Sequence, residues 1–523
     1  MIATLITSLR QSRFAPLMAF VLGAITPFSL APYHIWPLAL LTIGLFSELL
    51  SQQTPKMAAF RGWCFGTGLW ATGVWWLFVS LHDYGSTPAW LAILMVGFVA
   101  VLMGLFTGVM GFIYRKYQFD RKPLLTFAPL FILFEWMKTW LFTGFPWLFT
   151  GYAFTDSALV GYAPILGVFG VSLLAVISAQ CVMALAKYNT KAWAYGVLML
   201  AVWLGGAGLQ YHTWSHSNLS KPLTVSIVQG NIPQDVKWQL EWRDKTLAIY
   251  KELSKHEWGR DLVIWPEAAV PMFQYEEEAQ VFLTEMENNA LAGHSAFVTG
   301  IPYADIQHLD AQGIPPFYNS MAALGENSYG LYFKQRLVPF GEYIPFESWL
   351  RGTIAFFSRD MSSFSAGNNQ QSPLFIKNYR LAAAICYEIA YPELTRHNAE
   401  KADFIATLSN DGWFGHSIGP HQHLQMVQMR ALETGKWIIR ATNNGVSALI
   451  DPHGHIRQQA PQFKQAILRG TVYVTEGHTP YSRFANWPVL ILSFVLLAWT
   501  RWRVLRQAKS LLPSTLAPTP PNQ

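Results

Sequence analysis

Charged residues are scarce in this sequence of 523 residues. Asp, Glu, Lys and Arg together make up 13% of the chain and hydrophobic residues make up 52%, whereas an ordinary soluble domain is about 25% charged. This composition excludes a fully soluble enzyme and a disordered chain. It also excludes a protein that binds nucleic acid through a basic face, so we expect no nucleic acid among the partners.

Cysteine is scarce as well, with three in the whole chain. Cys64 and Cys181 lie in strongly apolar stretches, which leaves Cys386 without a disulfide partner in the polar middle of the chain. An unpaired cysteine in a domain outside the cytoplasm is a candidate reactive thiol. A free cysteine is also common in apolar cores, and Cys386 alone leaves the two interpretations equally open.

The sequence contains eight long apolar runs. A membrane-spanning helix needs about 20 mostly apolar residues, and Lys and Arg gather before the first run, in every second linker and after the last run. The linkers near 31–34, 81–88 and 144–157 contain neither. This alternation predicts cytoplasmic termini and a middle region on the far side of the membrane. The eight runs are residues 14–31, 34–50, 57–80, 88–114, 124–143, 158–186, 192–210 and 486–502.

The charges divide the chain in the same way. Residues 1–210 hold 11 basic and 5 acidic side chains, and residues 484–523 hold 4 basic and no acidic ones. Residues 211–483 hold the remaining 22 basic and 26 acidic side chains. We therefore predict seven transmembrane helices in 1–210, a separate domain in 211–483, an eighth transmembrane helix in 484–504 and a basic, disordered tail in 505–523.

Two charged residues, Glu135 and Lys138, interrupt the fifth apolar run. Their spacing of three residues puts them on one face of a helix, and charges at membrane depth usually face a protein interior. Two interpretations stay open. They form a mutually neutralising structural pair, or they make a polar contact to a lipid headgroup or to the outer domain.

The middle region predicts an α/β domain. Short stretches rich in Val, Ile, Leu and aromatic residues, bounded by Gly, Pro, Asn or Asp, indicate strands, and helical stretches separate several of them. Such alternation indicates sheets covered by helices, here two sheets packed face to face with helices outside. We expect strands at 223–228, 261–265, 296–301, 320–324, 331–334, 381–386, 404–408, 437–441, 447–450 and 466–474, and helices at 243–255, 276–292 and 421–434.

Four residues with chemical potential follow or end these strands. Glu267 follows a strand in the sequence Trp-Pro-Glu, where a partly desolvated carboxylate suits a general base. Lys334 ends an aromatic strand, and a lysine beside a thiol lowers the thiol pKa and stabilises an oxyanion. Glu342 lies in the next Pro/Gly turn, and an apolar strand runs directly into Cys386, which exposes a nucleophile at the sheet edge. Together they supply the parts for thiol acyl transfer.

The histidines do not indicate a metal site. Two of them open an expected helix at positions i and i+2, which point apart, and two others lie in a turn, without a companion cysteine or a well-spaced carboxylate. We therefore expect no metal ion and no cofactor. The residues concerned are His416, His421, His423, His453 and His455.

The motifs around these residues resemble the nitrilase superfamily. Glu267 in WPE, Lys334 in KxxLVPFGEYIP and Cys386 in CYE occur in the superfamily's order, and further matching motifs are SNDGWF at 409–414, RALE at 430–433, RATNNG at 440–445 and DPHG at 451–454. This resemblance implies a four-layer αββα sandwich with a Glu-Lys-Cys triad. Eight spans around such a domain, with TGFPW at 143–147 in a loop at the membrane edge, are similar to the bacterial apolipoprotein N-acyltransferase family.

The family resemblance implies a role for each motif residue. Glu267 would be the general base, Lys334 the cation that stabilises the oxyanion, and Cys386 the nucleophile that carries the acyl group. Glu342 would be a supporting carboxylate. The apolar stretch 346–357, just after the lysine motif, indicates a lid or lipid-contact arm, or ordinary packing against the domain. Further positions expected to bind substrate are Trp238, Tyr387 and Glu388.

The resemblance also implies a reaction and a place for it. An acyl chain would pass from a phospholipid, phosphatidylethanolamine, to Cys386 as a thioester, and then to the N-terminal amine of a diacylated apolipoprotein. Two half-reactions at one cysteine predict ping-pong kinetics. The enzyme would be a monomer in a bacterial inner membrane, with its catalytic domain in the periplasm.

Two other functions use the same features differently. A membrane-anchored amidase or nitrilase would hydrolyse a lipid-like or amide substrate with the same triad and release the acyl group to water. A transporter whose outer domain only binds a ligand would need broken helices or polar sites at mid-membrane, for which the sequence offers only Glu135 and Lys138.

Overall fold

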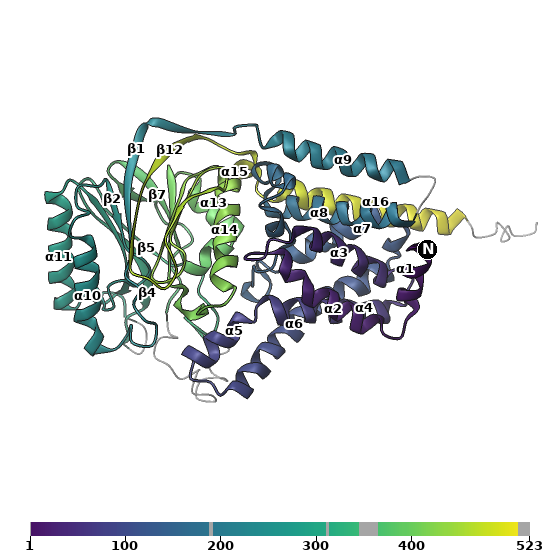
Figure 1. Ribbon diagram of the computed structural model, residues 1–523, viewed down its shortest axis with the longest axis horizontal. Coiled ribbons are helices and arrows are strands. Elements are labelled where there is room, and N and C mark those ends of the chain that lie inside the picture. The colour runs from purple at the N-terminus through teal and green to yellow at the C-terminus, as the bar shows by residue number, and fades with distance from the viewer. Residues whose placement is uncertain (1, 188–191, 310–312, 345–363, 511–523) are drawn as a thin grey trace, which may run out of the picture.

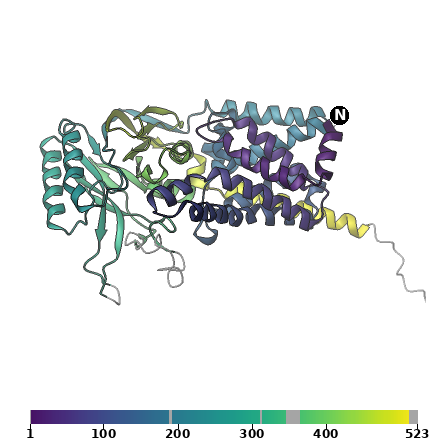
Figure 2. The same cartoon turned by 60° about the horizontal axis from the view of Figure 1, so that its bottom comes forward.

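The computed structural model describes residues 2–187, 192–309, 313–344 and 364–510. A bundle of helices and an α/β sandwich lie end to end, and Figures 1 and 2 show this arrangement from two sides. The predicted arm at 346–357 and the tail from residue 511 lie outside the described residues.

The bundle is built from apolar helices with short connections. Small residues let two of them approach closely: a Cβ added at Gly62 of α4 would lie 2.3 Å from the carbonyl oxygen of Thr107 in α6, the kind of contact that membrane helices use for association. The helices are α1 (Ile2–Gln11), α2 (Ala15–Ile25), η1 (Thr26–Ser29), α3 (Trp36–Leu50), α4 (Pro55–Gly73), α5 (Trp76–Val79), η2 (Ser80–Tyr84), α6 (Ala89–Lys116), η3 (Phe119–Arg121), α7 (Pro123–Met137), η4 (Leu141–Thr143), η5 (Thr150–Phe154), η6 (Ala158–Tyr162), α8 (Ala163–Lys187), α9 (Ala192–Leu209), α15 (Pro480–Phe484) and α16 (Trp487–Ser510).

Apolar helices occur at all eight predicted runs, but not all have the length of a span. Among the described residues, four helical segments are long and apolar enough to cross a membrane, or five if the bent pair Pro55–Gly73 and Trp76–Tyr84 is one span. Three shorter apolar helices, Ala15–Ser29, Trp36–Leu50 and Pro123–Met137, cover the other runs. The helix α3 has 15 residues, or about 22 Å at 1.5 Å per residue, which is less than the roughly 30 Å of a hydrocarbon core.

The last helix extends further than predicted. We expected the eighth run to end at 504 and a disordered tail to follow, but α16 continues to Ser510. The guanidinium of Arg506 lies 4.0 Å from the centre of the Trp502 ring, one turn earlier in the helix, and such cation–π contacts stabilise the cation over the ring. Residues 505–510 are therefore helical.

Glu135 and Lys138 are both buried but do not form an ion pair. No ion-pair contact of 4.0 Å or less joins them. Oε1 of Glu135 instead accepts hydrogen bonds from the Thr150 amide at 2.7 Å and hydroxyl at 2.8 Å. The Lys138 ammonium lies 5.4 Å from the Trp70 ring and 5.2 Å from the Phe149 ring. The two charges are therefore not in direct contact: Glu135 anchors the loop that follows its own helix, and Lys138 packs against two aromatic rings.

The α/β domain contains two six-stranded sheets, which confirms the predicted pair of sheets. One has the order β12-β1-β2-β3-β4-β5 and the other β11-β10-β9-β8-β7-β6. In both sheets of the described residues, parallel and antiparallel neighbours are mixed; for example, β7 is parallel to β8 and antiparallel to β6. The strands are β1 (Ser215–Gln229), β2 (Leu262–Ile264), β3 (Ala296–Ala304), β4 (Phe317–Gly325), β5 (Gly330–Phe333), β6 (Leu374–Ile376), β7 (Tyr379–Ile385), β8 (Phe404–Ser409), β9 (Ile438–Thr442), β10 (Ala448–Ile450), β11 (Ile456–Gln459) and β12 (Ala466–Gly477).

Three apolar cores produce the four layers. Between the sheets, Ile264 and Val298 of one sheet share a core with Leu381 and Leu408 of the other. The helices α10 (Leu240–Ser254) and α11 (Glu277–Ala292) pack on the outer face of the first sheet. The helices α13 (Pro392–Ala399) and α14 (Gly419–Thr434) pack on the outer face of the second. The αββα order is visible in Figure 1.

Helix α14 also joins the sandwich to the bundle. It lies between the second sheet and the membrane helices (Figure 1), and three of its side chains bond to the bundle. Gln422 Nε2 donates to the carbonyl of Gly73 at 3.2 Å, and Glu433 Oε1 accepts from the amide of Val168 in α8 at 2.7 Å. Gln425 Oε1 accepts from a further amide of the bundle at 3.1 Å. The α/β domain is thus docked on the bundle by polar contacts along one helix.

Candidate active site

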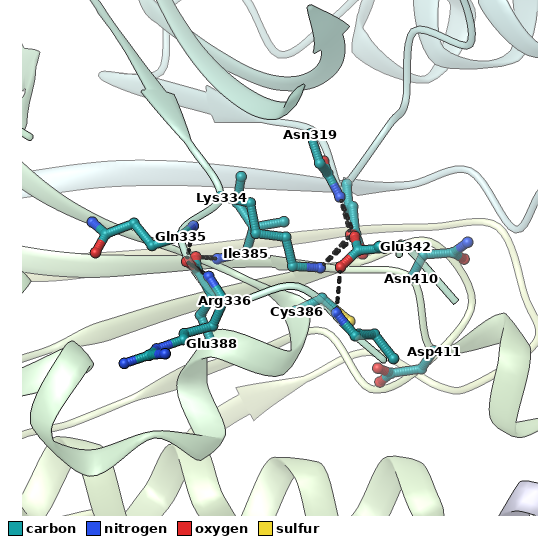
Figure 3. Close-up of polar contacts among 12 residues, drawn as sticks. Asn319, Lys334, Gln335, Arg336, Glu342, Ile385, Cys386, Glu388, Asn410 and Asp411 are labelled. Carbon is teal, nitrogen blue, oxygen red and sulfur yellow. Dashed lines mark hydrogen bonds and ion pairs between the residues drawn. The ribbon is translucent and has the colours of Figure 1, made fainter. Parts of the chain in front are cut away.

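Strand ends from both sheets bring the predicted chemical residues together. Glu267 follows β2, Lys334 follows β5, and Cys386 directly follows β7. Lys334 and Asn319 are placed by the pairing of β4 with β5, because the Lys334 amide donates to the Asn319 carbonyl at 2.9 Å. Figure 3 shows Lys334, Glu342, Asn319 and Cys386 gathered in one group.

Lys334 stands between two carboxylates. Its Nζ lies 2.7 Å from Oε1 of Glu342 and 3.4 Å from Oε1 of Glu267, and the side chain is 1% exposed. The Asn319 amide donates to the same two oxygens, at 3.0 Å to Glu342 and 2.7 Å to Glu267. Burial opposes the charge on Lys334, but Glu342 and then Glu267 outweigh it and raise its pKa above the ordinary value. Lys334 is therefore a permanent cation.

Glu267 is fixed by its backbone. Its neighbour Ala268 has a φ of +45°, and the turn lies against β3, where the Gly300 amide donates to the Pro266 carbonyl at 3.2 Å. A Cβ at Gly300 would lie 2.7 Å from the Glu267 Cα, so only glycine permits this approach. Among the described residues, no donor bonds to Oε2 of Glu267, which leaves this oxygen available for a proton.

Cys386 occupies a strained turn at the end of β7. Its φ is +52°, an uncommon value for a residue with a side chain, and strained residues of this kind cluster at functional sites. The Nε2 of His423 in α14 donates to the Cys386 carbonyl at 3.1 Å. Burial and then the charge of Glu267 raise the pKa of the Cys386 thiol well above its ordinary value, although Lys334 lowers it. The resting sulfur is therefore a thiol, and it needs a base.

Glu388 does not belong to this group. It is fully buried, and its carboxylate accepts from the amides of Gln335 at 2.6 Å, Arg336 at 3.2 Å and Ile385 at 2.7 Å. Figure 3 shows this second group beside the first. Burial raises the pKa of Glu388 to about 7, against the effect of these amides. Glu388 ties the segment after Lys334 to the end of the cysteine strand, so the geometry favours a positioning role over the expected contact with substrate.

Tyr387 connects the cysteine turn to the bundle. Its hydroxyl donates to the carbonyl of Gly144 at 3.3 Å, and the Tyr391 hydroxyl donates to the same oxygen at 3.3 Å. Its ring is stacked at 6.4 Å on Trp147, whose indole N–H donates to Gln422 at 2.8 Å. The TGFPW motif at 143–147 therefore lies directly against the residue after Cys386.

Two residues of this site were missed by sequence reasoning. Lys237 is 2% exposed, and its Nζ donates to the backbone carbonyl of Glu267 at 2.9 Å. It directly precedes Trp238, which is half-buried and whose ring lies 5.8 Å from the Lys237 ammonium. Asn319 is the second. Neither lies in a recognisable motif, and only the fold brings them to the strand ends.

The histidines fall in different places. His423 is buried beside Asp411 and Arg440, with Nδ1 at 3.1 Å from Oδ1 of Asp411. Burial and then the guanidinium of Arg440 lower the pKa of His423, which favours the neutral ring: Nε2 donates to the Cys386 carbonyl, and Nδ1 accepts from the Arg440 guanidinium at 3.2 Å. In the described ranges, no group of three or more His, Cys, Asp or Glu side chains could hold a metal ion.

Known protein families match both parts of the chain, the apolar bundle and the α/β domain. The family model for the apolipoprotein N-acyltransferase N-terminal domain covers residues 22–181, and the carbon-nitrogen hydrolase model covers residues 224–476. The protein of Azotobacter vinelandii named apolipoprotein N-acyltransferase is 42% identical over 505 residues, which is 95% of this chain and 96% of that protein. The chain belongs to the apolipoprotein N-acyltransferase family.

Other relatives agree with this membership. The apolipoprotein N-acyltransferase of Pseudomonas putida is 43% identical over 490 residues, covering 92% of this chain and 95% of that protein. Among solved structures, Saccharomyces cerevisiae Nit3, a member of branch 10 of the nitrilase superfamily, is 17% identical, with a TM-score of 0.36, and covers 57% of this chain and 97% of that one. The two family models and the apolipoprotein N-acyltransferase relatives confirm the family predicted from the motifs.

Proposed function

We propose that this protein is an apolipoprotein N-acyltransferase, which moves an acyl chain from a phospholipid to the N-terminal amine of an S-diacylglyceryl-cysteine apolipoprotein. Its relatives carry that name at about the same length. The observation that carries the proposal is the position of the thiol. Cys386 adjoins Glu267, Lys334 and Glu342, while the next residue, Tyr387, bonds to a loop of the apolar bundle.

In the first half-reaction, Cys386 would take the acyl chain. Glu267 accepts the thiol proton through its free oxygen, and the thiolate attacks the ester carbonyl of the lipid. The Lys334 ammonium stabilises the tetrahedral oxyanion, and Glu342 holds that ammonium in place at 2.7 Å. The ester C–O bond then breaks, the lysophospholipid leaves with the proton from Glu267, and a thioester remains on Cys386.

In the second half-reaction, the neutral amine of the acceptor attacks the thioester carbonyl. Lys334 stabilises the oxyanion again, and Glu267 takes the proton that the attacking nitrogen loses. The C–S bond breaks, and the sulfur of Cys386 receives this proton. The site returns to its first state after one amide has formed, so the two substrates act in turn.

The membrane topology that we propose is based on the sequence and on the apolar helices. We infer eight membrane segments with both termini in the cytoplasm, which places residues 211–483 in the periplasm; the absence of Lys and Arg from alternate linkers supports this orientation. The three short helices would cross only as parts of the packed bundle. Phosphatidylethanolamine as donor, Trp238 as a substrate contact and a monomeric enzyme complete the proposal.

The test uses purified protein in phospholipid vesicles, with and without a synthetic diacylated lipopeptide. The proposal expects lysophospholipid and N-acylated lipopeptide in equal amounts, and at most one lysophospholipid per enzyme when the acceptor is left out. Continuous release of free fatty acid without acceptor would instead identify a membrane-anchored amidase or nitrilase. A Cys386→Ser variant is the control, and full transfer by it would contradict the proposal.

A further inference from the structure

A second lysine lies in the active site beside the triad. Lys237 is 2% exposed, and its Nζ donates to the backbone carbonyl of Glu267 at 2.9 Å. An ammonium group has three hydrogens to donate. In the part of the chain that the structure describes, no carboxylate lies within 4.0 Å of this group, so two of its hydrogens have no partner.

The two lysines of the site differ in what holds their charge. Lys334 is paired with Glu342 at 2.7 Å and Glu267 at 3.4 Å, and these carboxylates keep it charged. Among the described side chains, Lys237 has no such carboxylate partner: its ammonium contacts the Glu267 backbone carbonyl at 2.9 Å and the Trp238 ring at 5.8 Å. Burial lowers its pKa to about 8, although the charges of Glu267 and Cys386 oppose this shift. Donors without a hydrogen-bond partner in a buried place lower stability, which indicates that Lys237 has a use other than stability.

The negative charge of the site changes its position when the thiol proton moves. The two carboxylates and Lys334 together carry one negative charge, which Lys237 neutralises. When the proton passes from Cys386 to Glu267, the negative charge moves to the sulfur, and Lys334 remains paired with Glu342. A thiolate in such a buried place needs a cation close by. The titratable or charged groups that face the sulfur are Glu267, Lys334, Asp411, Glu342 and Lys237.

We propose that Lys237 is the second cation of the active site, which pairs with the Cys386 thiolate once Glu267 has taken the thiol proton. Lys237 donates to the Glu267 backbone carbonyl and interacts electrostatically with both Glu267 and Cys386, so its ammonium lies near the group that takes the proton and near the sulfur that becomes charged. The inference rests on the proposed function, since it assigns a role within the same thiol chemistry. It adds a residue to the Glu-Lys-Cys triad.

The test measures the thiol itself and needs neither lipid nor acceptor. The full-length protein in detergent is alkylated with iodoacetamide between pH 6 and 10, and the modified Cys386 peptide is quantified by mass spectrometry. Lys237→Met should slow alkylation at pH 7.5 by about 10-fold or more, because a nearby opposite charge shifts a pKa by about 1–3 units. The difference from wild type should shrink above about pH 8, where Lys237 loses its proton.

Two further variants separate charge from position. Lys237→Arg keeps the charge and should react within a few-fold of wild type. Lys237→Gln keeps an amide donor for the Glu267 carbonyl but has no charge, so it should be as slow as Lys237→Met. Wild-type alkylation by Lys237→Gln would overturn the proposal, and so would a wild-type profile for Lys237→Met.

Lys436 offers a matched control. It is 4% exposed, its Nζ donates to the Ala402 carbonyl at 2.6 Å, and burial lowers its pKa to about 8. It precedes β9, whereas Cys386 follows the parallel strand β7, so the two lie at opposite ends of their sheet. Lys436→Met should leave the alkylation profile unchanged, and an equal slowing would contradict the proposal. If alkylation behaves as expected but no acyl transfer occurs, only the proposed function fails.

Discussion

Replacing Lys334 with methionine should separate the stability of the active site from its chemistry. The ammonium lies 2.7 Å from Glu342 and 3.4 Å from Glu267, and Asn319 bonds to both carboxylates. The Lys334→Met variant leaves these two negative groups together without a cation. Removing one partner of a buried ion pair costs about 3–5 kcal/mol, which corresponds to a fall in the unfolding midpoint on the order of 10 °C.

A second substitution tests the cause of that loss. Glu342→Gln, combined with Lys334→Met, removes one of the two stranded carboxylates and keeps the shape of the side chain. The double variant should recover more than half of the lost midpoint. It should not recover acyl transfer, because the cation for the oxyanion is still missing, and loss of such a donor lowers the rate by about 10²–10³-fold.

Two assays read these quantities separately. Thermal unfolding in detergent gives the midpoint, and lysophospholipid release from vesicles gives the rate of transfer, with Glu342→Gln alone as the control for the second change. A wild-type midpoint for Lys334→Met would refute the ion-pair reasoning. Wild-type transfer by the double variant would refute the role of Lys334 at the oxyanion.

Four other variants test the surroundings of the triad. Burial raises the pKa of Glu388 to about 7, so its carboxylate gains a proton and releases a backbone amide as the pH falls through 7. The rate of acyl-enzyme formation should therefore fall below pH 7. The Glu388→Gln variant should be slow at every pH. Tyr387→Phe loses one hydroxyl to Gly144 and should cost about 1 kcal/mol with little change in rate, whereas Tyr387→Ala, which removes the ring, should cost about 3–5 kcal/mol in unfolding experiments. Glu433→Ala leaves the buried Arg430, 2.8 Å away, without its partner and should lower the free energy of unfolding by about 3–5 kcal/mol. The rate of Cys386 alkylation should not change. A loss of alkylation would contradict a role for Glu433 in docking alone.

The sandwich and the triad could be predicted because their signals are local. Buried strands have continuous apolar runs, and Glu267, Lys334 and Cys386 lie where such runs end. The strands β6 and β11 were missed because they are three and four residues long and lie at the two edges of their sheet. The sequence of β11 is Ile-Arg-Gln-Gln, which has no apolar pattern, whereas β6 is Leu-Phe-Ile and is too short to stand out as a strand.

The second lysine and the role of Glu388 could not be predicted because they depend on long-range contacts. Lys237 reaches the site through a bond to a residue 30 positions away. Glu388 was expected to contact substrate. It instead accepts hydrogen bonds from the amides of Gln335 and Arg336, which lie 53 and 52 positions away in the sequence, and these bonds favour a positioning role. Nothing in the residues around either one indicates such partners.

The lengths of the apolar helices also could not be predicted from the sequence pattern. Hydropathy indicates an apolar helix at each of the eight runs, but in the described residues only four or five helical segments have the length of a span, and hydropathy does not show where a run is broken. The helix α8, for example, contains Gly167 with a φ of +65°, and the Glu433 carboxylate caps the amide of Val168 just after it. A contact from the other domain thus determines where that helix begins its regular part.

The most direct test of the account is the chemical state of the sulfur at Cys386. The protein is mixed with phospholipid bearing a labelled acyl chain, without acceptor, then digested and mapped by mass spectrometry. The account predicts one acyl chain on the peptide with Cys386, none on those with Cys64 or Cys181, and its removal by hydroxylamine at neutral pH, as expected for a thioester. An unmodified Cys386 after lysophospholipid has formed would contradict it.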